Sequence, residues 1–176
     1  FFALVWALHR LLPHRGQNLL LLAASYYFYA CWDWRFLPLI MVVTLVSFWT
    51  ALGIAGTDDR SKQRRWVIVS AGVSLMILGF FKYWGFFTES AVALLAALGF
   101  HADFSTLHVL LPVGISFYTF QTMSYTLDVY RGEVKATRNL IDYSLYVAYF
   151  PQLVAGPIER SSSLLPQITE PRRRRD

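Results

Sequence analysis

Residues 110–132 begin with an apolar sequence typical of a membrane span and continue with many polar side chains. This combination restricts the fold more than any other feature of the sequence. Wound as a helix, residues 115–128 gather hydroxyl, amide and carboxylate groups on one broad face. That face consists of Tyr118, Thr119, Gln121, Thr122, Tyr125, Thr126 and Asp128. Polar groups left unsatisfied in hydrocarbon are costly. The polar face is therefore expected to meet protein or a wet cavity rather than lipid.

Charged side chains are scarce and gather in short clusters between long apolar runs. They make up 15% of the 176 residues, whereas an ordinary soluble domain has about 25%. The clusters lie at 10–15, 58–65, 131–138 and 172–176. This layout predicts an all-α fold, namely a polytopic membrane protein of transmembrane helices plus re-entrant or interfacial helices. Basic loops beside apolar spans also account for the net charge of +5, so we expect a lipid bilayer and no nucleic acid as partner.

The apolar segments predict five membrane spans and two shorter helices. The spans are residues 1–12, 18–32, 36–55, 66–81 and 108–130. Residues 1–12 are expected to be the remainder of a longer helix, which would make the chain a fragment of one membrane domain. The shorter helices, expected to be interfacial or re-entrant, are residues 89–100 and 140–157. If neither crosses, every basic cluster lies on one side of the membrane, predicted to be the cytoplasm. Backbone breaks are expected at Pro112, Gly114, Pro151, Gly156 and Pro157.

No catalytic apparatus is visible in the sequence. The four histidines lack the spacing of metal ligands, Cys31 is the single cysteine, and no phosphate-binding loop or activated-serine motif is present. We therefore expect neither a metal site nor a catalytic residue in this chain. The candidates for lining a substrate path are Tyr118, Gln121, Thr122, Tyr125, Asp128 and Gln152. Hydrogen bonding between helices explains such side chains about equally well, and an ion pair with Arg131 is the favoured role for Asp128.

Two motifs resemble the bacterial membrane-bound O-acyltransferase family. The first is LPVGISFYTF at 111–120, continued by DVYRG at 128–132, and the second is YFPQLVAGPI at 149–158. Shorter matches occur upstream at 18–21, 24–30 and 79–83. The resemblance covers nearly the whole chain, and its closest branch is the alginate O-acetyltransferase type.

The resemblance implies an enzyme of the bacterial inner membrane that passes an acyl group, with acetyl favoured, to an exported polysaccharide such as alginate. It implies a cytoplasmic acyl donor, acetyl-coenzyme A or another, which is a substrate rather than a covalently bound cofactor. It also implies a periplasmic acetyltransferase as a partner. The hallmark histidine of the family lies on a later segment with motifs that do not occur here. The chain thus resembles the N-terminal portion of such an enzyme, and we expect it to be inactive by itself.

Two other functions fit parts of the sequence. Broken helices within the membrane are also typical of transporters and channels. A non-catalytic membrane subunit that docks a polysaccharide-acetylating enzyme is the second alternative. In that case, apolar substitutions of the polar face would leave the activity of the whole complex intact.

Overall fold

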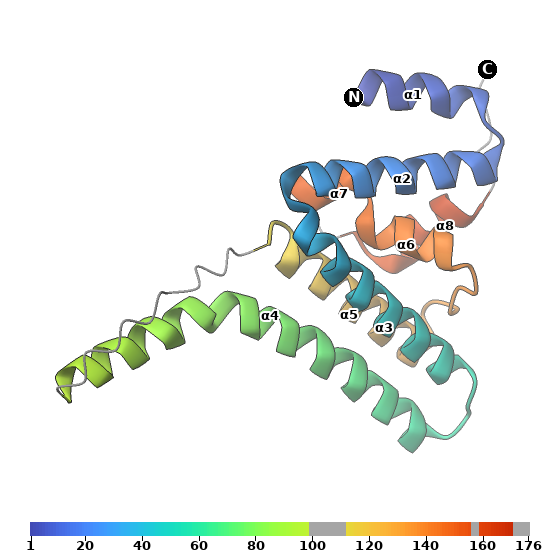
Figure 1. Ribbon diagram of the computed structural model, residues 1–176. Coiled ribbons are helices and arrows are strands. Elements are labelled where there is room, and N and C mark those ends of the chain that lie inside the picture. Colours follow the sequence, from blue (N-terminus) through green and yellow to red (C-terminus); the bar gives the residue numbers. More distant parts are fainter. Residues whose placement is uncertain (99–111, 156–158, 171–176) are drawn as a thin grey trace.

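Every regular element that the structure describes is a helix (Figure 1). The computed structural model describes residues 1–98, 112–155 and 159–170. The elements are α1 (Phe2–Leu11), α2 (His14–Asp33), the 3-10 helix η1 (Trp34–Phe36), α3 (Leu37–Ala55), α4 (Arg60–Ala97), α5 (Ile115–Arg131), α6 (Leu140–Ala148), α7 (Phe150–Ala155) and α8 (Ser161–Thr169). The all-α prediction is confirmed. Gly156, Pro157 and the first residues of the predicted span 108–130 lie outside the described residues.

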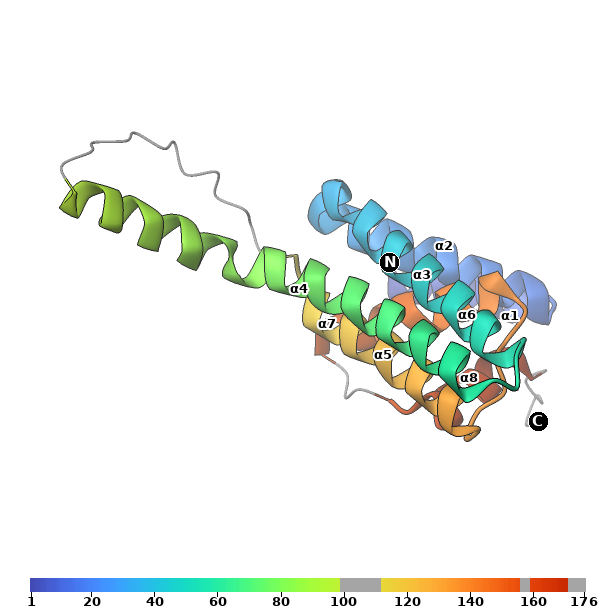
Figure 2. The ribbon, with the colours of Figure 1, turned by 90° about the horizontal axis from the view of Figure 1, so that it is seen from below.

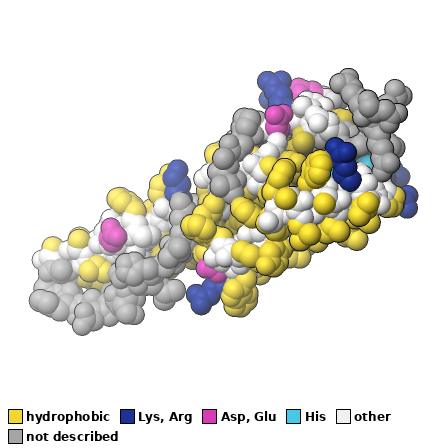
Figure 3. All heavy atoms as spheres, turned by 90° about the horizontal axis from the view of Figure 1, so that it is seen from above, with side chains coloured by type: hydrophobic (Ala, Val, Ile, Leu, Met, Phe, Trp, Pro, Cys, Tyr) yellow, Lys and Arg dark blue, Asp and Glu magenta, His cyan; other side chains and the backbone are white. Residues whose placement is uncertain are grey.

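Two helical stretches of the described part are long and apolar enough to cross a membrane. One is His14–Ala55, which combines α2, η1 and α3, and the other is Arg60–Leu95 within α4. Large apolar side chains remain exposed along them, including Trp49 and Met76. Hydrophobic side chains also cover much of the molecular face in Figure 3. Apolar surfaces of this extent face lipid or further protein, and the fold is that of an all-helical membrane protein.

The helices form a bundle in which α3, α4 and α5 lie side by side (Figures 1 and 2). Helix α2 packs against α1 and α6, while α8 packs against α5 and α6. The centre of the bundle is apolar, with Ile40 and Val43 of α3, Ile115 of α5 and Leu145 of α6 almost completely buried. Residues 142–148 of α6 are all buried. From residue 142 onward this short helix is therefore surrounded by the rest of the chain, whereas Leu140 and Ile141 at its start are exposed.

Helix α4 differs from the sequence prediction. The predicted span 66–81 and residues 89–97 of the predicted short helix 89–100 belong to one continuous helix of 38 residues, and residues 99–100 lie outside the described part. The intervening residues contain no proline, and the single Gly85 costs a helix only about 1 kcal/mol relative to alanine. Nothing in the sequence therefore stops the helix between 82 and 88. The second half of α4 extends beyond the bundle (Figures 1 and 2).

Two serines of α4 are buried in the bundle, and one of them bonds to α5. Ser70 and Ser74 are one turn apart, and each is 1% exposed. The Ser70 and Thr126 hydroxyl oxygens are 3.1 Å apart and share a hydrogen bond. Small residues of this kind let two membrane helices approach closely, and here they bring α4 against the edge of the polar face of α5.

Candidate functional site

The polar face of α5 is buried inside the protein. Tyr118, Thr119, Gln121 and Thr122 are each 0% exposed, and Tyr125, Thr126 and Asp128 are at most 8% exposed. Phe120, on the opposite side of the helix, is 46% exposed. The expectation that the polar side is sheltered from lipid is therefore confirmed. The shelter comes from α3, α4, α6 and α8, which all contact α5.

A break between α6 and α7 lies against this face. At the junction, Tyr149 has ψ 107°, far from the helical value, and Pro151 follows in the first turn of α7. A proline ring clashes with the carbonyl four residues earlier, here that of Val147, and carries no amide hydrogen. Pro151 therefore disfavours a straight continuation of α6 through this position. Gln121 Nε2 donates a hydrogen bond of 2.8 Å to the Tyr146 carbonyl at this break.

Gly114 brings the start of α5 close to α7. It has φ 76° and ψ 0°, the left-handed conformation that glycine adopts without strain. A Cβ atom at this position would lie 3.2 Å from the Leu153 carbonyl oxygen. Two requirements, the backbone conformation and the close approach, thus favour glycine here. The structure places Pro112 and Gly114 directly before the first residue of α5, Ile115.

We expect Gly114→Ala to destabilise the full-length protein by about 1–2 kcal/mol, because a Cβ atom is strained at this φ and crowds α7. The measurement is a denaturant titration in detergent micelles. Gly79→Ala is the matched control, since an added Cβ there meets no atom within 4 Å. Equal losses of unfolding free energy in Gly114→Ala and Gly79→Ala would contradict the proposal that position 114 requires glycine.

Polar atoms without a partner gather on α5, α6 and α7. Five buried side-chain atoms on these helices make no hydrogen bond of good geometry with a described residue, namely Tyr118 Oη, Thr119 Oγ1, Gln121 Oε1, Tyr146 Oη and Gln152 Oε1. The Tyr118 hydroxyl still lies beside Tyr29, and the Tyr146 hydroxyl beside the Gln121 side chain. Buried polar groups in native proteins almost always have a partner. These atoms are therefore available to water, to a polar ligand or to protein outside the described residues. Tyr146 and Thr119 were absent from the predicted lining set, although Thr119 was placed on the polar face.

Tyr125 has a structural partner. Its hydroxyl oxygen accepts a hydrogen bond of 3.0 Å from the Thr137 amide, in the connection between α5 and α6. Its ring packs 4.6 Å from that of Tyr143, whose hydroxyl donates to Ser47 Oγ at 2.7 Å. Among the described residues, the Thr122 hydroxyl donates to carbonyls of its own helix. For these two residues the structure shows helix packing.

The two buried carboxylates join different helices, and Asp128 connects α8 to α5. Asp128 Oδ2 accepts a hydrogen bond of 2.5 Å from Ser161 Oγ at the start of α8. The predicted ion pair with Arg131 is wrong, because Asp128 turns inward to Ser161 and the described residues contain no such pair. Asp142 accepts from Asn18 and Asn139, at 2.8 and 2.7 Å.

Sequence reasoning missed α8. The helix has an amphipathic pattern, with Leu165 and Ile168 buried and Leu164 partly buried, and this pattern could have predicted a helix. Pro166 argues against a helix at this position, because proline is unfavourable in a helix interior. Asn18 was missed as well. Its Nδ2 donates both to Asp142 and to the Ile168 carbonyl, at 2.8 and 2.9 Å, and so joins α2, α6 and α8.

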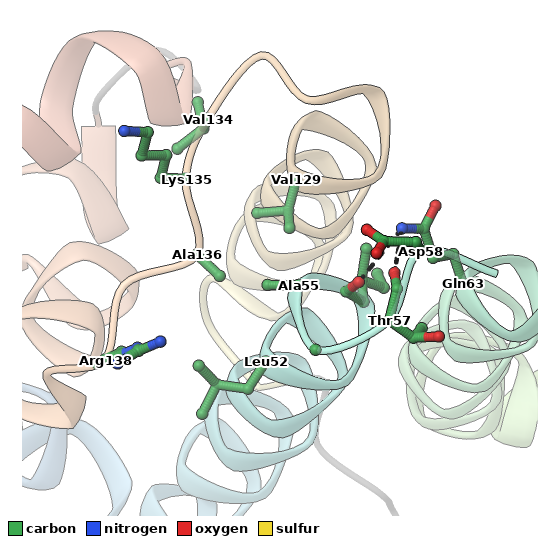
Figure 4. A pocket seen from close by; sticks show the side chains of 12 residues that line it. Leu52, Ala55, Thr57, Asp58, Gln63, Val129, Val134, Lys135, Ala136 and Arg138 are labelled. Carbon is green, nitrogen blue, oxygen red and sulfur yellow. Dashed lines mark hydrogen bonds between the residues drawn. The ribbon is translucent and has the colours of Figure 1, made fainter. Parts of the chain in front are cut away.

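Two pockets lie away from the polar face. The larger, about 440 Å³, lies between the end of α3 and the connection from α5 to α6 (Figure 4). Its polar lining includes Thr57, Asp58, Gln63, Lys135 and Arg138. The smaller, about 220 Å³, is mostly apolar and lies between α1, α2 and α7. None of the predicted path-lining residues lines either pocket, so their lining role stays a prediction. Within the described residues, no group of three His, Cys, Asp or Glu side chains could hold a metal ion.

The comparisons with known proteins point to bacterial O-acetylation. The probable alginate O-acetylases AlgI of Pseudomonas putida and Pseudomonas aeruginosa are each 46% identical to this chain, and the matches cover 96% of it. The matches cover 35% and 32% of those two proteins. The chain belongs to the membrane-bound O-acyltransferase family. A peptidoglycan O-acetyltransferase of Helicobacter pylori is 32% identical over 87% of the chain and is matched over 33% of its own length.

The chain spans about a third of the length of the curated relatives it matches. The family resemblance carried by the two motifs is thereby confirmed. No protein-family model matches the chain, and no solved structure does.

Proposed function

We propose that this chain forms part of the acyl-transfer path of a membrane O-acetyltransferase that modifies an exported polysaccharide such as alginate. The observation that carries the proposal is a set of five buried polar atoms beside the α6–α7 break that make no well-formed hydrogen bond with a described residue. They belong to Tyr118, Thr119, Gln121, Tyr146 and Gln152. The names of the relatives, which refer to alginate and peptidoglycan O-acetylation, support the reaction class. Non-helical backbone inside a membrane is tolerated where it is enclosed by protein or lines a wet cavity.

In the proposed reaction, a sugar hydroxyl oxygen attacks the carbonyl carbon of an acetyl thioester such as acetyl-coenzyme A. A new ester C–O bond forms, the C–S bond breaks, the hydroxyl proton passes to a general base, and the thiolate leaves. The base is proposed to be a histidine outside this chain. The Tyr118 and Thr119 hydroxyls could donate to the acetyl carbonyl oxygen, whereas the Gln121 and Gln152 amide oxygens could accept from sugar hydroxyl groups. These bonds would replace the water that the substrate groups lose.

We further propose that the protein crosses the bacterial inner membrane several times, with the basic loops in the cytoplasm. The clusters at 10–15, 58–65 and 131–138 support this orientation, because positive loops stay on the cytoplasmic side. The donor would then approach from the side of these clusters. A periplasmic acetyltransferase is the proposed partner on the opposite side, where the acceptor polysaccharide is exported.

The test uses the full-length protein in a bacterium that lacks its own alginate O-acetylase, with the acetyl content of the secreted polysaccharide as readout. The unsubstituted protein is expected to restore acetylation. Tyr118→Phe is expected to lower the rate roughly tenfold, the loss of one hydrogen bond of about 1.4 kcal/mol to the reacting groups. Phe120→Leu, on the exposed side of the same helix, serves as the control for protein amount and insertion.

Two outcomes would contradict this proposal. Failure of the unsubstituted protein to restore acetylation would exclude the reaction class. Normal acetylation by the Tyr118→Phe and Gln152→Leu variants would show that these polar atoms are not needed for acyl transfer. It would favour a docking subunit instead.

A further inference from the structure

The α6–α7 break separates the two halves of one hydrogen bond. In a continuous helix, the Phe150 amide would donate to the Tyr146 carbonyl four residues earlier. Here each group is paired with a side chain from another helix. Gln121 Nε2 of α5 donates to the Tyr146 carbonyl at 2.8 Å, and the Phe150 amide donates to Ser25 Oγ of α2 at 3.2 Å.

Both side chains are suited to these roles. Ser25 and Gln121 are each 0% exposed, so water from the surface does not reach them. The Ser25 hydroxyl already donates to the Leu21 carbonyl at 2.7 Å, which leaves its oxygen as an acceptor for Phe150. The Gln121 amide presents its NH₂ group, the donor that a freed carbonyl needs.

The cost of leaving either backbone group unpaired is large. A buried donor or acceptor without a partner loses its full solvation, and in a membrane no water is present to replace it. Pro151 favours the break, because its ring clashes with the Val147 carbonyl of a continuing helix and its nitrogen carries no hydrogen to donate. The break can therefore persist only if other residues satisfy Tyr146 and Phe150.

We propose that Gln121 and Ser25 are positioning residues that hold the α6–α7 break, by supplying the donor and the acceptor that Pro151 forces apart. This role is separate from the proposed contact with substrate and does not depend on the reaction. It assigns Gln121 Nε2 to the backbone of α6 and leaves only its Oε1 for the path. It also gives a function to Ser25, which the sequence did not single out.

The test is a double-mutant cycle in the full-length protein, purified in detergent micelles. Gln121→Met keeps the side-chain volume and removes the donor, and Pro151→Ala allows the helix to continue. With Pro151 present, Gln121→Met is expected to raise the unfolding equilibrium constant about tenfold, as for one lost hydrogen bond. In the Pro151→Ala background the increase is expected to stay below about threefold, because Phe150 can then donate to Tyr146.

A second measurement follows the Phe150 amide directly by hydrogen–deuterium exchange. Ser25→Ala is expected to speed its exchange about tenfold, because the amide loses its only acceptor among the described residues. Thr44→Val is the matched control, since this buried hydroxyl donates to Ile40 of its own helix and is not bonded to the break. It is expected to leave Phe150 exchange unchanged.

The inference is overturned if Gln121→Met is equally harmful with and without Pro151. It is also overturned if Ser25→Ala leaves Phe150 exchange at the rate of the unsubstituted protein. The exchange measurement needs no Pro151 variant, so it decides the matter even if Pro151→Ala does not fold. Neither readout involves acetyl transfer, so loss of the proposed activity would not be confused with failure of this inference.

Discussion

Replacing Tyr143 by alanine is expected to lower the free energy of unfolding by about 3 kcal/mol, the lower end for truncation of a buried aromatic side chain. The ring is 0% exposed and packs against Tyr125, Phe48 and Tyr146, with centroids 4.6, 5.8 and 5.9 Å away. Its removal leaves a cavity among α3, α5 and α6. The lower end applies because exclusion from water contributes less between membrane helices than packing does.

The measurement is a denaturant titration of the full-length protein in detergent micelles. Tyr143→Phe is the matched control and should cost only about 1 kcal/mol, since it removes the hydrogen bond to Ser47 and keeps the ring. Ser47 also donates to the Val43 carbonyl, so it is not left without a partner. If both substitutions cost the same, packing is not what Tyr143 contributes.

Replacing Asn18 by leucine is expected to cost about 3 kcal/mol, because two hydrogen bonds are lost at once and one of them involves a buried carboxylate. Asp142 would lose the donor at its Oδ1, and the Ile168 carbonyl would lose its Asn18 partner. Asn18 is 2% exposed and Asp142 is 9% exposed, so water would replace these bonds poorly. The unfolding free energy of the full-length protein in micelles measures the loss.

The same substitution should loosen α8 more than the rest of the protein. Amide exchange in α8 is expected to speed up, while exchange in α3 stays slow. Leu19→Ala is the control, because Leu19 is the next residue of α2 and is 56% exposed. Unchanged exchange in α8 would mean that Asn18 does not hold this helix in place.

Features encoded locally could be predicted from the sequence. The polar face of α5 follows from the helical period of residues 115–128, and the cost of polar groups in lipid predicts its burial. Pro151 predicts a break in the segment 140–157 for a steric reason that involves only its neighbours. These local rules, with the two family motifs, were sufficient for the fold class and the family.

Features that depend on distant residues could not be predicted. Asn18 meets Asp142, and Ser25 meets Phe150, across more than a hundred residues of sequence, and a local pattern does not record such pairings. The continuity of α4 was missed because an apolar run with one glycine fits two short helices as well as one long helix. For α8, tertiary contacts through Ser161 and Ile168 outweigh the low helix propensity of Pro166.

The length of α6 has a consequence for where the break lies in a bilayer. Nine residues give a helix of about 14 Å, whereas the hydrocarbon core is about 30 Å thick. If the charged 131–138 connection lies at the membrane surface, as proposed, and α6 runs along the membrane normal, the far end of α6 reaches only the midplane. Tyr149 would then sit at the depth where the barrier to a polar group is highest, half-way between the two leaflet surfaces.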